Sequence, residues 1–152
     1  MCMYAPQGSG DALLACFDRR HRVALIRTGP ANADHPWTLP AVRRGKAESY
    51  RRAVQRLARV LAPAGAIRLG AVTGRIPAAA PGASLRRGQR ERRLFTGHVT
   101  SPGALHDAAV PLVWLPYAQV AELALGLGIA ELGLFLEGYV GGWIPDGRIT
   151  LE

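Results

Sequence analysis

Arginine supplies most of the side chains in this chain that could carry chemistry. Eighteen of its nineteen basic residues are arginines, and with eleven acidic residues the net charge is +8. A guanidinium group forms two parallel hydrogen bonds to a phosphate or a carboxylate. The excess therefore favours anionic partners, which include nucleotides, phosphorylated metabolites, nucleic acid and acidic proteins. A drift in composition is the alternative explanation, because a GC-rich genome also produces chains rich in Ala, Gly and Arg.

The arginines gather at 43–59 and at 86–93, and these two segments supply most of the candidate ligand-binding residues. The candidates are Trp37, Arg43, Arg44, Glu48, Arg52, Arg56, Arg59 and Arg93. Glu48 and Arg56 allow two interpretations: a charge contact that fixes a loop on a helix, or a role for Arg56 as a phosphate ligand. Trp37 could stack on a base or pack in the core. The 86–93 segment could equally be a solvated surface.

The sequence indicates no other site of chemistry. Its four histidines are isolated, and Cys2 and Cys16 form neither a disulfide framework nor a metal-binding set. It contains no Gly-rich phosphate loop, hydrolase triad or nucleic-acid-binding motif. Binding to nucleic acid would therefore rest on charge alone, no residue is assigned a catalytic role, and we expect no cofactor.

Alternating and apolar runs separated by Gly, Pro and Asp predict the strands. They are expected at 11–17, 23–27, 37–39, 66–73, 91–99 and 110–115, with an edge strand at 148–152. The first two would form a hairpin. The segments 28–36, 41–47 and 76–89 are predicted to be loops, because they are rich in turn-forming residues or lack periodicity.

Three helices are predicted, at 47–62, 117–125 and 129–140. In the first, a spacing of about 100° per residue places one set of apolar residues on one side: Ala53, Val54, Leu57, Ala58, Val60 and Leu61. The opposite side carries Arg51, Arg52, Gln55, Arg56 and Arg59. The last helix is apolar nearly all round, with only Glu131 and Glu137 as charges. Such a helix must be covered by the body of the domain or by a second subunit, which makes a homodimer one expectation.

Length and composition indicate one globular domain, since the chain has 152 residues, 49% of them apolar and 20% charged. Residues 1–10 lack the basic start and apolar run of a signal peptide. The longest apolar region, 123–136, is interrupted by Glu131 and is too short to span a bilayer. We therefore expect a cytoplasmic protein with no membrane partner.

The segment 37–64 resembles the Nudix box together with its usual lead-in, Trp37-Thr-Leu-Pro40. Laid on that box without a gap, Glu48 and Arg56 fall on its first glutamate and its arginine. Leu57, Val60 and Leu61 fall on its other three glutamates, and Pro63 falls on a glycine. The order of the predicted elements is also similar to that of the family. The resemblance implies an α+β fold, with a mixed sheet sandwiched between helices in one domain covering 1–152.

What the resemblance implies for function follows from the three replaced glutamates. Nudix hydrolases split diphosphate linkages with divalent cations, which the box glutamates hold in that family. Leu57, Val60 and Leu61 offer no ligand atom, and the surrounding arginines would repel a cation. We therefore expect a degenerate Nudix-like domain that binds a nucleotide or another phosphorylated anion, without a metal and without ordinary hydrolysis.

Two alternatives stay open. One is a divergent enzyme on the same scaffold that does not use the box glutamates, either a nucleoside-diphosphate-type hydrolase or a catalyst of unrelated chemistry. The other is an interaction subunit that pairs through the apolar C-terminal helix. A binding domain or an enzyme predicts a pocket between the box loop and the arginine-rich strand at 91–99. An interaction subunit predicts a large exposed apolar patch.

Overall fold

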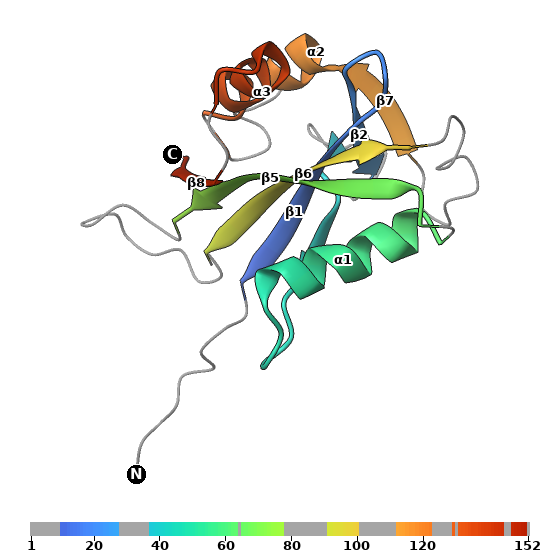
Figure 1. The fold of residues 1–152 in the computed structure, drawn as a ribbon, viewed down its shortest axis with the longest axis vertical. Coiled ribbons are helices and arrows are strands. Elements are labelled where there is room, and N and C mark those ends of the chain that lie inside the picture. Colours follow the sequence, from blue (N-terminus) through green and yellow to red (C-terminus); the bar gives the residue numbers. More distant parts are fainter. Residues whose placement is uncertain are drawn as a thin grey trace.

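The computed structural model describes residues 10–27, 37–63, 65–77, 91–100, 112–122, 129, 131–144 and 147–151. One mixed sheet has helix α1 on one face and helices α2 and α3 on the other (Figure 1). The strands are β1 Asp11–Phe17, β2 Arg22–Arg27, β3 Trp37–Thr38, β4 Ala41–Arg43, β5 Ile67–Ile76, β6 Arg92–Val99, β7 Leu112–Pro116 and β8 Gly147–Thr150. The helices are α1 Tyr50–Leu61, α2 Tyr117–Glu122 and α3 Leu132–Gly141. The predicted α+β fold in one domain is confirmed.

Strand β1 lies in the middle of the sheet, whose order is β3-β2-β1-β6-β5-β8. It pairs in parallel with β6, where Leu13 is opposite Leu94, and antiparallel with β2 and β4. Strand β7 adds to β2, and β8 pairs in parallel with the outer side of β5. The nearly continuous apolar sequence of β1 suits this position, because both of its faces are covered.

Alternate residues of β1 belong to two separate hydrophobic cores, one on each face of the sheet. Leu13, Ala15 and Phe17 join the core under α2 and α3. Leu14 and Cys16 join the core under α1. Burial raises the pKa of the Cys16 thiol to about 12, so this cysteine stays protonated inside the sheet. The sheet therefore separates the α1 side of the molecule from the α3 side.

Helix α1 begins later than predicted, because Ser49 is its N-cap. Ser49 has an extended backbone, and its Oγ accepts a hydrogen bond of 3.1 Å from the Arg52 N–H. Ala47 and Glu48 consequently belong to the preceding loop. The predicted buried side is confirmed except at Val60, which is 54% exposed. The prediction for Val60 is wrong because this residue lies at the edge of the buried face, about 60° around the helix from Leu57 and about 100° from Leu61.

Several other boundaries also differ from the predictions. The expected loop 41–47 contains β4, whose residues pair with β1, and the strand expected at 66–73 continues to Ile76 past an irregularity between Leu69 and Thr73. The last helix begins at Leu132, not at 129. The hairpin of β1 and β2 and the C-terminal edge strand are confirmed. Cys2, His35, His106 and the arginines at 86–90 lie outside the described residues.

Within the described part of the chain, no helix is both long enough and apolar enough to cross a bilayer.

Candidate functional site

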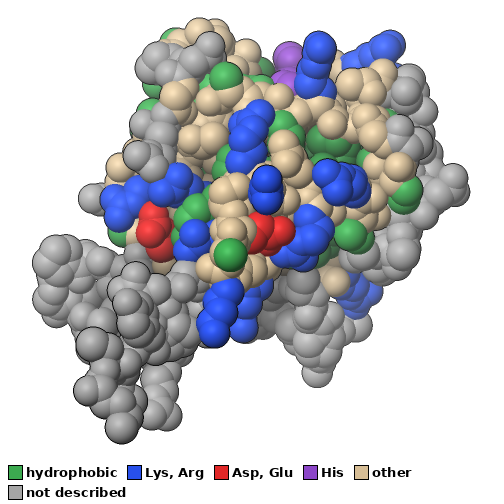
Figure 2. All heavy atoms as spheres, turned by 60° about the horizontal axis from the view of Figure 1, so that its bottom comes forward, with side chains coloured by type: hydrophobic (Ala, Val, Ile, Leu, Met, Phe, Trp, Pro, Cys, Tyr) green, Lys and Arg blue, Asp and Glu red, His purple; other side chains and the backbone are tan. Residues whose placement is uncertain are grey.

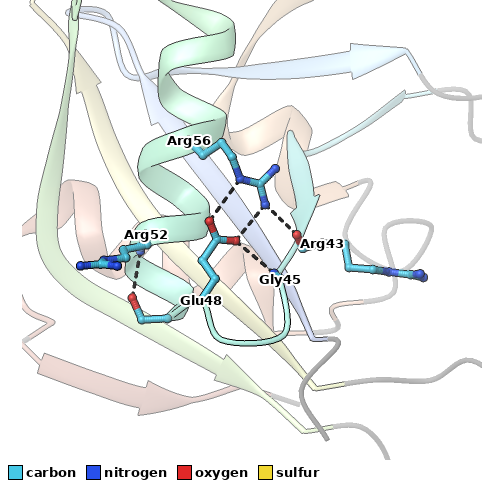
Figure 3. A network of polar contacts seen from close by, with 6 residues as sticks. Arg43, Gly45, Glu48, Arg52 and Arg56 are labelled. Atoms are coloured by element: carbon cyan, nitrogen blue, oxygen red, sulfur yellow. Dashed lines mark hydrogen bonds and ion pairs between the residues drawn. The ribbon is translucent and has the colours of Figure 1, made fainter. Parts of the chain in front are cut away.

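An ion pair between Glu48 and Arg56 fixes the box loop, residues 43–49, against α1 (Figure 3). Arg56 Nε donates to Glu48 Oε2 at 3.2 Å, and Arg56 Nη2 donates to Glu48 Oε1 at 2.9 Å. The same Nη2 donates to the Arg43 carbonyl at 2.9 Å, while the Gly45 N–H donates to Glu48 Oε1 at 3.1 Å. The two residues meet although they are eight apart, because Glu48 precedes the helix. The structure therefore supports the first of the two interpretations, in which a charge contact between Glu48 and Arg56 fixes a loop on a helix.

These hydrogen bonds hold Glu48 in its charged form. The donation from Arg56, followed by that from the Gly45 N–H, lowers the pKa of Glu48 from an ordinary 4.5 to about 2. The same pairing raises the pKa of Arg56. A carboxylate that is already bonded to a guanidinium and to a backbone N–H is a poor general acid or base near neutral pH.

We expect the stability contributed by Glu48 to disappear as pH falls from 4.5 to 2. Its pKa is lower in the folded chain, so the unfolded chain binds the extra proton first and unfolding is favoured in that interval. Glu48→Gln keeps the size of the side chain and removes the titration. Urea denaturation of both proteins between pH 7 and pH 2 should therefore show a difference in unfolding free energy that narrows below pH 4.5. A difference independent of pH would contradict this assignment.

A second cluster forms around Tyr50, the first residue of α1. The guanidinium of Arg44 lies 4.4 Å from the centre of the Tyr50 ring, and that of Arg93 lies 4.8 Å from it. Arg93 Nε is buried without a hydrogen bond and lies 3.7 Å from Glu91 Oε1, which accepts a 2.8 Å bond from Arg75. Arg44 and Arg93 thus reach the same ring from distant parts of the sequence, which no local pattern in the sequence indicates.

The side chains of the other predicted site residues join neither cluster, although the Arg43 carbonyl accepts a hydrogen bond from Arg56. The side chains of Arg43 and Arg52 point away from the Glu48–Arg56 pair in opposite directions (Figure 3). Trp37 is half-buried and packs against the core on the α2 and α3 side of the sheet, so it lies on the opposite face from α1. The structure therefore supports the core interpretation of Trp37 over a role beside the box loop.

The three residues that the resemblance places at the other box glutamates do not fit a magnesium ion. Leu57 and Leu61 are only 7% and 1% exposed, and they pack in the core under α1 together with the half-buried Val42, Leu112 and Trp114. Val60 faces solvent and carries no oxygen. Within the described ranges, no three His, Cys, Asp or Glu residues are grouped so that they could hold a metal.

A cavity of about 360 Å³ lies on the other flank of α1, between this helix and β5. It is lined by Arg51, Gln55, Ala58, Arg59, Ala62, Gly65, Ile67 and Leu69. We call it the α1–β5 cavity. Arginine side chains gather over this face of the molecule (Figure 2). The cavity does not lie where the sequence predicted a pocket, between the box loop and the strand at 91–99. The sequence signal for it was the four-residue spacing of Arg51, Gln55 and Arg59, which places them on one side of a helix.

Comparison with solved structures shows which fold these elements form. A Nudix hydrolase from M. smegmatis, RenU, matches with a TM-score of 0.64 and 22% identity over 88% of this chain and 87% of its own. A C. elegans Ap4A hydrolase in a binary complex matches with a TM-score of 0.62 and 14% identity over 88% of this chain and 96% of its own. The chain has the Nudix fold.

A third Nudix-fold match shows how far sequence and structure diverge. The E. coli dihydroneopterin triphosphate pyrophosphohydrolase has a TM-score of 0.57 and 13% identity over 87% of this chain and 94% of its own. The sequence itself matches no protein-family model and no curated protein. The Nudix fold is therefore established by geometry.

Proposed function

We propose that this Nudix-fold chain binds a nucleotide or another phosphorylated anion and does not carry out metal-dependent hydrolysis. The observation that carries the proposal is the burial of Leu57 and Leu61 at two of the box-glutamate positions, where they form part of the core. A metal supplies several kcal/mol of transition-state stabilisation in phosphoryl chemistry, and each 1.36 kcal/mol is tenfold in rate. A site without carboxylates would therefore lose a rate factor of thousands or more.

The arginines of α1 support the binding part of the proposal. Arg51 and Arg59 are exposed cations on one helix, and no ion pair involving them occurs among the described residues. Arg59 lies three residues from the cation of Arg56, and like charges at that spacing destabilise a helix. An anionic ligand would relieve this repulsion. Two of the matched structures are named for phosphate-containing compounds, Ap4A and dihydroneopterin triphosphate, and the proposal extends that ligand class to this chain.

The direct test combines metal binding with turnover. We expect calorimetry to detect no specific binding of Mg²⁺ or Mn²⁺. We also expect a panel of nucleoside diphosphate derivatives to show no metal-dependent release of phosphate above about 1 per second. A metal-dependent Nudix hydrolase assayed in parallel is the control. Turnover at ordinary enzyme rates with metal would overturn the proposal, and turnover without metal would favour a divergent enzyme on this scaffold.

A second proposal concerns self-association, and it rests on the opposite face of the molecule. Leu134 and Trp143 are each 60% exposed, and they line an apolar cavity of about 270 Å³ between α3 and β8. Helix α3 carries one acidic residue and no cation. Two chains that each carry +8 meet with least repulsion at such a face. We therefore propose a second copy of this chain as the partner of α3.

A further inference from the structure

We infer that the phosphorylated ligand occupies the α1–β5 cavity, where an arginine at one end of the row formed by Arg51, Gln55 and Arg59 binds its phosphate and the apolar floor receives a nucleoside base. This inference rests on the proposed function and adds the place and the class of the ligand. It places the ligand on the flank of α1 that faces β5, whereas the Glu48–Arg56 pair lies on the flank that faces the box loop.

The spacing of the polar side chains supports this placement. Arg51, Gln55 and Arg59 are four residues apart and form one row along α1. Successive members of the row are separated by about 6 Å along the helix axis, at 1.5 Å per residue. Two guanidiniums thus flank one amide over a length of about 12 Å. This row can contact a phosphate group at one end of a ligand and hydrogen-bond a polar edge further along it.

The charges around the cavity favour an anion. Neither Arg51 nor Arg59 forms an ion pair or a side-chain hydrogen bond within the ranges that the structure describes. None of the described lining residues is acidic. Arg56 differs, because Glu48 and the Arg43 carbonyl already bind two of its three nitrogens. The cations lining the cavity are therefore better placed to bind a ligand than the arginine that belongs to the box.

The size and the floor of the cavity define the class of ligand. Ala58, Ala62, Ile67 and Leu69 form an apolar floor, which suits a flat base better than the hydroxyl groups of a sugar. A volume of about 360 Å³ lies near the lower end of the roughly 300–1,000 Å³ of ligand cavities. The ligand is therefore a mononucleotide with one or two phosphates, and Gln55 can both donate to and accept from its base.

Two double variants with equal loss of charge test this site. Arg51→Gln with Arg59→Gln removes both cavity arginines, and Arg43→Gln with Arg52→Gln removes two arginines that do not line the cavity. The probes are ADP, AMP and inorganic pyrophosphate, with Kd measured by calorimetry at one low salt concentration. We expect the cavity variant to bind ADP at least tenfold more weakly and the control variant less than threefold more weakly. Wild type should bind ADP at least tenfold more tightly than pyrophosphate.

The outcomes separate the site from the function. Equal weakening by both variants would overturn the cavity as the site, because a diffuse basic surface then explains binding. If only the Arg43→Gln and Arg52→Gln variant lost affinity for ADP, the ligand would lie at the box loop. That result would also overturn the cavity as the site. Both results leave the proposed binding function standing, whereas a wild type that binds none of the three probes overturns the function itself. Circular dichroism melting of each variant checks that the fold is retained.

Discussion

A glutamate introduced at position 61 is expected to lower the free energy of unfolding by about 4 kcal/mol or more. Leu61 is 1% exposed, and its neighbours in the core under α1 are apolar. A carboxylate there would be buried without a partner, either charged or protonated at neutral pH, and both states are costly. Because small domains are stable by only about 5–15 kcal/mol, Leu61→Glu should be partly unfolded or melt far below wild type. Urea denaturation at pH 7 measures the change.

Val60→Glu is the matched control, since it introduces a glutamate at the neighbouring position of the same helix. Val60 is 54% exposed, so this change should alter the free energy of unfolding by no more than about 0.5 kcal/mol. If Leu61→Glu were as stable as wild type, and gained stability on adding Mg²⁺, the box would retain a metal pocket. That result would remove the main support for a domain without metal-dependent hydrolysis.

Leu134→Lys is expected to reduce the mass of the particle in solution from about two chains to one chain of 16.3 kDa. Leu134 is 60% exposed on α3 beside Trp143. A lysine in a closed interface would bring two added charges together across the symmetry axis of a dimer. Analytical ultracentrifugation at several protein concentrations measures the mass, and the melting temperature should become independent of concentration in the variant.

Val60→Lys provides the comparison for this experiment. Val60 is exposed to a similar extent but lies on α1, on the other side of the sheet. Val60→Lys should leave the mass of the particle unchanged. A change in mass confined to Leu134→Lys would therefore locate the contact between the two chains at α3. A wild type that sediments as a single chain at all concentrations would rule out pairing through α3.

The fold was largely predictable because its strongest signals are local. The apolar run of β1 and the periodicity of α1 each follow from residues that are close in sequence. Strand β4 was missed because three residues, Ala41 to Arg43, carry no periodic signal and form a strand only by pairing with β1. Such short strands depend on a partner that is remote in sequence, and therefore on contacts that a single sequence does not display.

The candidate site was less predictable, because its geometry depends on where α1 begins. A helix that included Glu48 would separate this residue from Arg56 by two turns, whereas the cap at Ser49 leaves Glu48 in a loop that folds back onto the helix. The Tyr50 cluster depends on the pairing of β1 with β6, which brings Arg93 to the end of the sheet. The α1–β5 cavity depends on how closely the helix packs on the strand. The spacing of Arg51, Gln55 and Arg59 indicates only that they share one side of α1, and it does not specify how that side packs.

The position of β1 also determines when this chain can finish folding during its synthesis. Leu13 is paired with Leu94, so the parallel partner of the first strand is made about 80 residues later. At synthesis rates of about 5–20 residues per second, this interval is on the order of 4–16 s. During that time β1 can pair with β2 and β4, but its other edge stays open and both of its apolar faces lack their full cover. The nascent chain therefore exposes an unpaired strand edge and apolar surface, both of which favour aggregation, until β6 has left the ribosome.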